Sequence, residues 1–128
     1  MDSTFFDKDA FSHHCGIRLL DVKPGYAAAE MPIEPKHLNS VGIVHGAAVF
    51  ALADAVFAAA SNSHGYVAVA VNISISYIKA VSEGVLRAEA QENNPRGRMG
   101  SYTITIRDQQ GDLAAVFQGL AYRKFDKL

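Results

Sequence analysis

The sequence is constrained most by an apolar run between Ala47 and Ala60, AAVFALADAVFAAA, in which thirteen of fourteen residues are Ala, Val, Leu or Phe. No Gly or Pro interrupts the run, and Ala and Leu favour helix. A helix that is apolar on all sides is buried on most of them. Its length of about 21 Å is too short for a bilayer, which needs roughly 20 residues. We therefore expect a helix enclosed by protein.

Asp54 is the one residue of this run that is not apolar. A buried carboxylate without a partner is costly unless it is protonated. Two interpretations are open. Asp54 is either a structural residue, which bonds a neighbouring backbone group or lines a wet subunit interface, or a catalytic carboxylate with a raised pKa. We favour catalysis, because proteins rarely bury a lone Asp without a functional reason.

The remaining composition narrows the class of protein. Hydrophobic residues make up 49% of the chain, as in a globular protein that also buries surface in an oligomer. The net charge of −1 offers little attraction to nucleic acid or to an anionic membrane, so neither is expected as a partner. Cys15 is the single cysteine, which fits a reducing compartment. We expect one cytoplasmic domain over residues 1–128, because residues 1–11 lack the pattern of a signal peptide.

Hydrophobic alternation predicts strands on both sides of the helix in the sequence. A short helix is expected over residues 3–14, capped by Ser3 or Thr4, with an apolar patch of Phe5, Phe6 and Phe11. The short connections favour an α+β fold, in which an antiparallel sheet of five to six strands covers the buried helix at about residues 46–62. Strands are expected over residues 17–22, 26–33, 67–77, 84–92, 99–107 and 113–123, followed by a frayed tail at 125–128.

The longest predicted strand alternates large residues with small or polar ones. Side chains two apart in a strand share a face. We expect the large set to pack on the helix: Val67, Val69, Val71, Ile73, Ile75 and Tyr77. The other set is left to solvent or to another subunit, and within it Asn72 and Ser74 are candidates for a polar contact with a substrate.

The helix N-terminus is a second candidate site. The first amides of a helix have no internal acceptor and the helix dipole is positive there. Gly46 has no side chain to block an oxygen that gains negative charge in an acyl transfer. Asp54 lies eight residues later, about 12 Å along the axis, so one chain cannot bring the two together. If two identical helices pack antiparallel, Asp54 of each can approach Gly46 of the other, which predicts an oligomer with composite sites.

Several other residues have both a functional and an ordinary interpretation. Asn39 either orients water or substrate or, more commonly for an isolated Asn, stabilises a turn. His45 alone is more often a local hydrogen-bonding residue than a catalyst. In the loop of residues 94–98, Arg96 and Arg98 either contact phosphates of a long ligand or form a solvated hairpin tip. Lys79 and Arg87 are weaker candidates for the same contact. The histidines and Cys15 show no metal-ligand spacing, so no metal is expected.

Residues 37–62 resemble the signature of the hotdog-fold thioesterases, in particular the PaaI-like acyl-CoA thioesterases (phenylacetic acid degradation) of the 4HBT superfamily. That signature is His-x-Asn, then Gly-x-x-His-Gly-Gly, then Leu-Ala-Asp, then Ala and Asn. It appears here as His37–Asn39, Gly42–Ala47, Leu52–Asp54, Ala60 and Asn62. The resemblance covers about residues 15–123 and implies the hotdog fold, with dimers that pair again into tetramers.

The resemblance also implies a role for each matching residue. Asp54 is implied as nucleophile or general base, acting on a thioester bound against the partner subunit. The Gly46 amide is implied as oxyanion donor, with His45 near the thioester sulfur and Asn39 positioning substrate or water. Coenzyme A is then part of the substrate, and no separate cofactor is expected.

This chain departs from the family pattern at two positions. Ala47 replaces the second Gly of the motif and adds a methyl group that narrows the pocket at the helix start. Ala58 stands where a related branch has a hydroxyl, so no helper is assigned there.

Three functions are weighed on this scaffold. The first is an acyl-CoA thioesterase, with an aryl-acetyl, medium-chain or short branched acyl group. The alternative is a non-catalytic acyl-CoA binder or sensor, which the retention of Asp54 in an otherwise inert helix disfavours. A hotdog dehydratase would need a His paired with a carboxylate in a different helix context, and the sequence shows no such pair. Dimer and tetramer both stay open.

Overall fold

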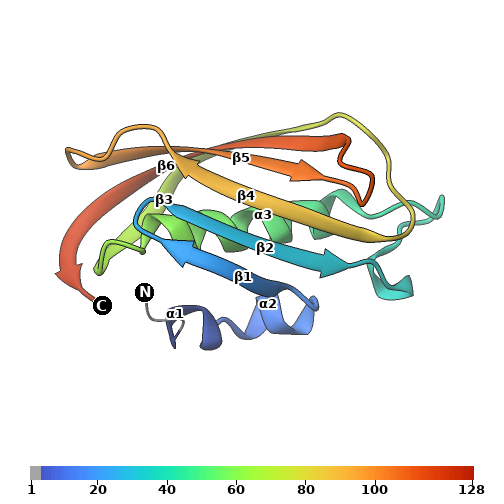
Figure 1. Cartoon of the computed structure of the whole chain (residues 1–128), viewed down its shortest axis with the longest axis horizontal. Helices are drawn as coiled ribbons and strands as arrows, with labels where there is room; N and C mark the ends of the chain where they lie inside the picture. The colour runs from blue at the N-terminus through green and yellow to red at the C-terminus, as the bar shows by residue number, and fades with distance from the viewer. Residues whose placement is uncertain (1–3) are drawn as a thin grey trace.

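The structure is a computed structural model that describes residues 4–128, and these form a six-stranded antiparallel sheet curved round the helix α3 (Gly46–Ser61) (Figure 1). The strand order β1-β2-β4-β5-β6-β3 leaves β1 and β3 at the edges. The predicted α+β hotdog fold is thus confirmed. The other elements are α1 (Thr4–Asp7), α2 (Ala10–His14), β1 (Arg18–Lys23), β2 (Tyr26–Pro32), η1 (Pro35–His37), β3 (Tyr66–Tyr77), β4 (Val85–Glu92), β5 (Met99–Arg107) and β6 (Leu113–Lys127).

Small residues on the inner face of the sheet let the strands approach α3 closely. Ala88 and Ala90 of β4 are fully buried in the core that the helix and sheet share. At Gly119 of β6, a Cβ atom would lie only 2.7 Å from the ring of Phe57, so this helix residue packs directly on the strand backbone. The ring of Phe57 also meets Tyr102 of β5 edge-on, at 5.7 Å between centroids. No helix within residues 4–128 is long and apolar enough to cross a membrane.

The N-terminal segment differs from the single helix predicted over residues 3–14. It forms two short helices: the first ends at Asp7, and Asp9 caps the second by accepting from the Ser12 N–H at 3.0 Å. Phe6 is buried, whereas Phe5 and Phe11 are exposed, so the three do not form one patch. The caps proposed at Ser3 and at the side chain of Thr4 lie outside what the structure describes.

The prediction of one large face along β3 is wrong, because the strand contains a β-bulge. Ala70 pairs with Ala121 and Asn72 with Leu120, which leaves Val71 as the extra residue. An extra residue reverses the alternation of side chains beyond it. Accordingly, the side chains of β3 that pack against the core are Ala68 before the bulge and Ile73 and Ile75 after it, while Val69 and Val71 are exposed.

The predicted frayed tail is also wrong. β6 continues to Lys127, which pairs with Tyr66 at the start of β3. The ring of Phe125 packs edge-on against Tyr66, with 5.7 Å between centroids. This aromatic contact and the backbone pairing hold the C-terminal segment on the long edge strand.

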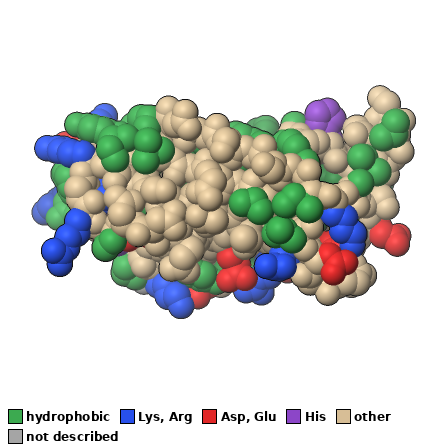
Figure 2. Space-filling model, turned by 90° about the horizontal axis from the view of Figure 1, so that it is seen from above, with side chains coloured by type: hydrophobic (Ala, Val, Ile, Leu, Met, Phe, Trp, Pro, Cys, Tyr) green, Lys and Arg blue, Asp and Glu red, His purple; other side chains and the backbone are tan. Residues whose placement is uncertain are grey.

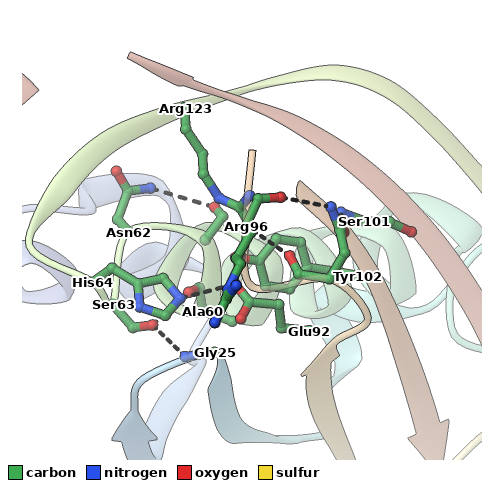
Figure 3. Close-up of polar contacts among 12 residues, drawn as sticks. Gly25, Ala60, Asn62, Ser63, His64, Glu92, Arg96, Ser101, Tyr102 and Arg123 are labelled. Atoms are coloured by element: carbon green, nitrogen blue, oxygen red, sulfur yellow. Dashed lines mark hydrogen bonds and ion pairs between the residues drawn. The ribbon is translucent and has the colours of Figure 1, made fainter. Parts of the chain in front are cut away.

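A polar network fixes the C-terminal end of α3 to three strands (Figure 3). Asn62 caps the helix and accepts from the Ala68 N–H of β3 at 2.9 Å. The Ser63 hydroxyl accepts from the Gly25 N–H before β2 at 2.8 Å and donates to the Ala60 carbonyl at 2.6 Å. The helix axis is therefore anchored at the end opposite Gly46.

Glu92 is the centre of the charged part of this network. Its Oε2 accepts from the Tyr102 hydroxyl at 2.6 Å, from His64 Nε2 at 2.8 Å and from the Arg123 guanidinium at 3.1 Å. Burial alone would raise the pKa of Glu92, but the bonds from Tyr102 and His64 and the charge of Arg123 outweigh it and lower the pKa. The side chains of Glu92 and Arg123 are each 8% exposed, so the pair is shielded from solvent.

Replacing Arg123 by Met should destabilise the fold. The substitution keeps apolar volume but leaves the Glu92 carboxylate buried without its guanidinium, which costs about 3 kcal/mol of unfolding free energy in urea titrations. Lys124→Met is the matched control, because Lys124 is exposed on the same strand and should change stability by about 0.5 kcal/mol or less.

The same pair predicts a pH dependence of stability. A lowered pKa means that Glu92 stabilises the fold above its ordinary value of 4.5, and that this contribution is lost as the pH falls through the folded-state pKa. The difference between wild type and Arg123→Met should therefore shrink at acid pH. The account is contradicted if Arg123→Met destabilises the fold no more than Lys124→Met does. It is also contradicted if the difference in stability between wild type and Arg123→Met persists unchanged below pH 4.5.

Candidate active site

His45 occupies the N-cap position of α3 and directs its ring into the helix start. Its Nδ1 accepts from the Ala47 N–H at 3.0 Å, so the proton of the neutral ring lies on Nε2. Its carbonyl accepts from the N–H groups of Ala48 and Val49. The local role expected of an isolated His is thus present, and it sets the tautomer of the ring.

Gly46 is left as the free amide of the helix start. The N–H groups of the next three residues are all bonded to His45. Among residues 4–128, the Gly46 N–H donates no hydrogen bond. An unpaired amide at the positive end of a helix dipole is suited to an oxygen that develops negative charge.

Tyr77 explains why residue 46 has no side chain. The Tyr77 hydroxyl donates to the Gly46 carbonyl at 2.9 Å. A Cβ atom at Gly46 would lie 3.1 Å from that hydroxyl oxygen and 3.2 Å from Cζ of the ring. Sequence reasoning did not name Tyr77 as a site residue, although it placed Tyr77 among the helix-facing residues of the strand. The expected position of Tyr77 against the helix is the sequence signal that could have identified it as a site residue.

Asn39 stabilises the loop before α3. Its Oδ1 accepts from the N–H groups of Val41 and Ile43, at 3.0 and 3.3 Å. The side-chain oxygen of Asn39 therefore stabilises a turn, as expected for an isolated Asn. Its Nδ2 has no acceptor within residues 4–128. A pocket of about 310 Å³ contains Asn39 together with Gly46, Tyr77 and other residues of the loops beside them.

His37, the first residue of the family motif, is buried. Its Nδ1 accepts from the Glu34 N–H at 2.9 Å and its Nε2 donates to the Cys15 carbonyl at 2.7 Å. Both ring nitrogens are therefore occupied by backbone groups. His37 holds the loop of η1 against the end of α2, and it positions the segment that leads to Asn39 and His45.

Asp54 lies midway along α3, on a stripe of the helix that the sheet leaves partly uncovered. It lines a second pocket, of about 570 Å³, between α2 and α3. Burial raises the pKa of Asp54, and the negative charge of Asp9 on the pocket wall raises it further. No hydrogen bond or ion pair holds the Asp54 carboxylate among residues 4–128. The lining residues are Asp9, Phe11, Ser12, Ala47, Phe50, Ala51, Asp54 and Tyr77.

The two chemical features of α3 therefore open into different pockets of one chain. Gly46 shares its pocket with Asn39, and Asp54 shares its own with Ala47. Tyr77 lines both pockets and lies between them. With about 12 Å of helix separating Asp54 from Gly46, the chain holds both groups but does not bring them together.

The predicted phosphate contacts differ in how far their charges are already paired. Lys79 is bonded to Asp108 at 2.6 Å and to Asp112 at 2.8 Å, and these bonds raise the pKa of Lys79. Arg98 lies over the ring of Phe125, 4.8 Å from its centroid, and bonds the carbonyl of Arg123.

Arg96 is exposed in the loop before β5, and its side chain has no ion pair within residues 4–128. Arg87 lies on β4 near Glu89, at 4.0 Å. Asn72 and Ser74 are exposed on the edge strand β3. Of the predicted phosphate contacts, Lys79 lines the Gly46 pocket, whereas the three arginines, Asn72 and Ser74 line neither that pocket nor the Asp54 pocket.

The sequence matches the family described as "Thioesterase superfamily" (4HBT) over residues 41–115, more than half of the chain. This chain belongs to the thioesterase superfamily. The matched region runs from the loop before α3 to the start of β6 and contains His45, Gly46 and Asp54. The resemblance drawn from residues 37–62 is thereby confirmed.

Individual relatives agree with this membership. A protein of Archaeoglobus fulgidus is 43% identical over 107 residues, which are 83% of this chain and 70% of that protein. The acyl-coenzyme A thioesterase PaaI of Escherichia coli is 34% identical over 119 residues, 92% of this chain and 85% of that protein. Its solved structure has a TM-score of 0.93, covering 97% of this chain and 91% of that one at 31% identity. The chain is therefore a PaaI-like thioesterase, a hydrolase of thioesters.

A more distant neighbour shares the fold. A protein of Streptococcus pneumoniae, solved with coenzyme A, has a TM-score of 0.90 and covers 99% of this chain and 100% of that one. At 20% identity, this likeness is one of architecture.

The pKa of Asp54 predicts the pH profile of this thioesterase. If Asp54 is the nucleophile or the base, it must be ionised to act, so kcat/KM should rise with pH through a pKa above the ordinary Asp value of 3.8. Asp9→Asn removes one of the two causes that raise this pKa, and should move the acid limb to lower pH. The exposed Asp7→Asn is the control. An acid limb that stays in place, or moves upward, in Asp9→Asn contradicts the assignment.

Proposed function

We propose that this thioesterase hydrolyses acyl-CoA thioesters, with an aryl-acetyl or medium-chain acyl group, to the free acid and CoA. The observation that carries the proposal is the pair of features on α3: a free Gly46 amide at the helix start and an unpaired Asp54 with a raised pKa in a largely apolar pocket. The named activity of E. coli PaaI supports the substrate class.

The chemistry requires one nucleophile and one place for negative charge. Asp54 either attacks the thioester carbonyl itself, giving an anhydride that water then cleaves, or removes a proton from an attacking water. In both routes the carbonyl oxygen gains negative charge, and the Gly46 N–H donates to it. The carbon–sulfur bond then breaks, and CoA leaves as the thiolate. His45 carries a proton on Nε2 that suits a position near this sulfur, and Asn39 offers Nδ2 to the substrate or water.

An oligomer is proposed to complete the site. Ala47, Phe50, Asp54 and Ala58 recur at helical spacing along α3, and the sheet leaves each of them partly or fully uncovered. Two such helices packed antiparallel would bring Asp54 of each chain towards Gly46 of its partner. A two-fold axis makes both sites equivalent. Either a homodimer or a homotetramer built of such dimers satisfies this requirement.

The edge strand β3 supports the same assembly. It has twelve residues and pairs with β6 on one side only. Val69 and Val71 are 44% and 51% exposed on it. Long apolar edges favour pairing with another strand. In the face shown in Figure 2, backbone, uncharged polar groups and scattered hydrophobic side chains fill much of the middle, while Lys and Arg lie mostly towards the margins. This distribution suits contact between subunits.

Coenzyme A is proposed as the carrier group, without a further cofactor. The S. pneumoniae structure shows that the same architecture accommodates coenzyme A in that protein. Arg96 is the favoured phosphate contact here, because its charge is not already paired within residues 4–128. Arg98 and Arg87 are secondary candidates, and Lys79 is the weakest because it clamps the hairpin between β5 and β6.

Free-thiol release from a panel of acyl-CoAs tests the proposal, with wild type beside Asp54→Asn. The Asn variant keeps size and hydrogen bonding but cannot act as nucleophile or base, so kcat should fall by about a thousandfold. Sedimentation should show the same oligomer for both proteins. Wild-type binding of acyl-CoA without any turnover contradicts the proposal and favours a non-catalytic binder. Full activity in Asp54→Asn removes Asp54 from the mechanism.

A further inference from the structure

We propose that the Asp54 pocket selects acyl groups without negative charge, and that Asp9 on the opposite wall is the specificity-determining residue. The substrate class is then neutral aliphatic or aryl acyl-CoA, and thioesters of dicarboxylic acids are rejected. This inference rests on the proposed thioesterase function and extends it to the acyl group.

The lining of the pocket carries two carboxylates, those of Asp54 on α3 and Asp9 at the start of α2. Tyr77 is the other titratable residue of the lining, and its hydroxyl donates to the Gly46 carbonyl. No Lys, Arg or His belongs to the lining among the described residues. From this chain, a terminal carboxylate on the acyl group would therefore meet two like charges and no cation.

Asp9 is held in place at this wall. Its Oδ1 accepts from the Ser12 N–H at 3.0 Å, and its Oδ2 accepts from the Ser12 hydroxyl at 2.6 Å. Ser12 is itself buried, so the Asp9 side chain is tied to a fixed point. Both donors are neutral, so the bonds orient the carboxylate without cancelling its charge.

The rest of the wall suits an apolar acyl group. Phe11, Phe50 and Ala51 surround the space between the two carboxylates. The volume of about 570 Å³ accommodates a six-carbon or aryl-acetyl chain. In surroundings of this kind an unpaired negative charge is poorly solvated, which adds to its repulsion by Asp9 and Asp54.

A matched pair of substrates isolates the charge. Hexanoyl-CoA and adipoyl-CoA have acyl chains of the same length and differ in the terminal carboxylate. We expect the wild type to favour hexanoyl-CoA in kcat/KM by on the order of tenfold or more. In Asp9→Asn this ratio should fall about fivefold, because Asn is an equally good N-cap and keeps the helix start while removing the charge. Asp7→Asn, on exposed α1 outside the pocket lining, should leave the ratio unchanged.

A second variant keeps the inference testable if Asp9→Asn fails to fold. Phe11 is 66% exposed on α2, so Phe11→Lys can place a cation at the pocket with little effect on the core. It should raise kcat/KM for adipoyl-CoA relative to hexanoyl-CoA. Circular dichroism of each variant checks the fold.

The outcomes separate this inference from the function on which it rests. Hydrolysis of hexanoyl-CoA with equal hydrolysis of adipoyl-CoA in the wild type overturns the selectivity and leaves the thioesterase intact. If wild type and folded Asp9→Asn show the same selectivity, Asp9 is not the cause of that selectivity. No release of thiol from any thioester overturns the proposed function itself.

Discussion

The structure depends on close packing between one apolar helix and a sheet whose inner face carries small residues. Alanines along β4, and Gly119 beneath Phe57, let the strands lie almost against the backbone of α3. That packing fixes the helix along its length, and the polar network around Glu92 and Asn62 anchors its far end. These contacts fix the directions of the first amide and the central carboxylate of the helix, and such preorganisation is what the proposed acyl transfer requires.

The capping pattern at the helix start gives the site its chemistry. His45 satisfies the next amides and leaves the Gly46 N–H free. Tyr77 occupies the space beside Gly46, fixes its carbonyl and separates the two pockets. The carboxylate that we propose as nucleophile or base lies in the other pocket, two turns along the helix. One chain does not bring the two groups together, and in the proposed antiparallel dimer a second copy would supply the missing half to each site.

Much of this could be predicted from the sequence, where the signal was local and strong. A long apolar helix with one carboxylate predicted α3 and singled out Asp54, and regular alternation predicted β5. The failures came from features without a local signature. The bulge at Val71 depends on pairing with β6, so period-two alternation alone assigned β3 a single face. The contacts of Tyr77 with Gly46 and of Asp9 with the Asp54 pocket join segments far apart in the chain.

The most direct test of a shared site is complementation between two inactive variants. Gly46→Pro removes the amide N–H at a helix position that tolerates Pro, and the extended backbone of His45 suits a following Pro. The half-exposed Tyr77 ring must shift by a few tenths of an ångström to admit the new Cβ atom. Asp54→Asn removes the carboxylate. When the two chains are co-refolded in equal amounts, about half of the dimers are hybrids, and each hybrid has one of its two sites intact. Thiol release should therefore recover to about a quarter of the wild-type rate. Mixtures that stay as inactive as the separate variants would contradict a site built from two subunits.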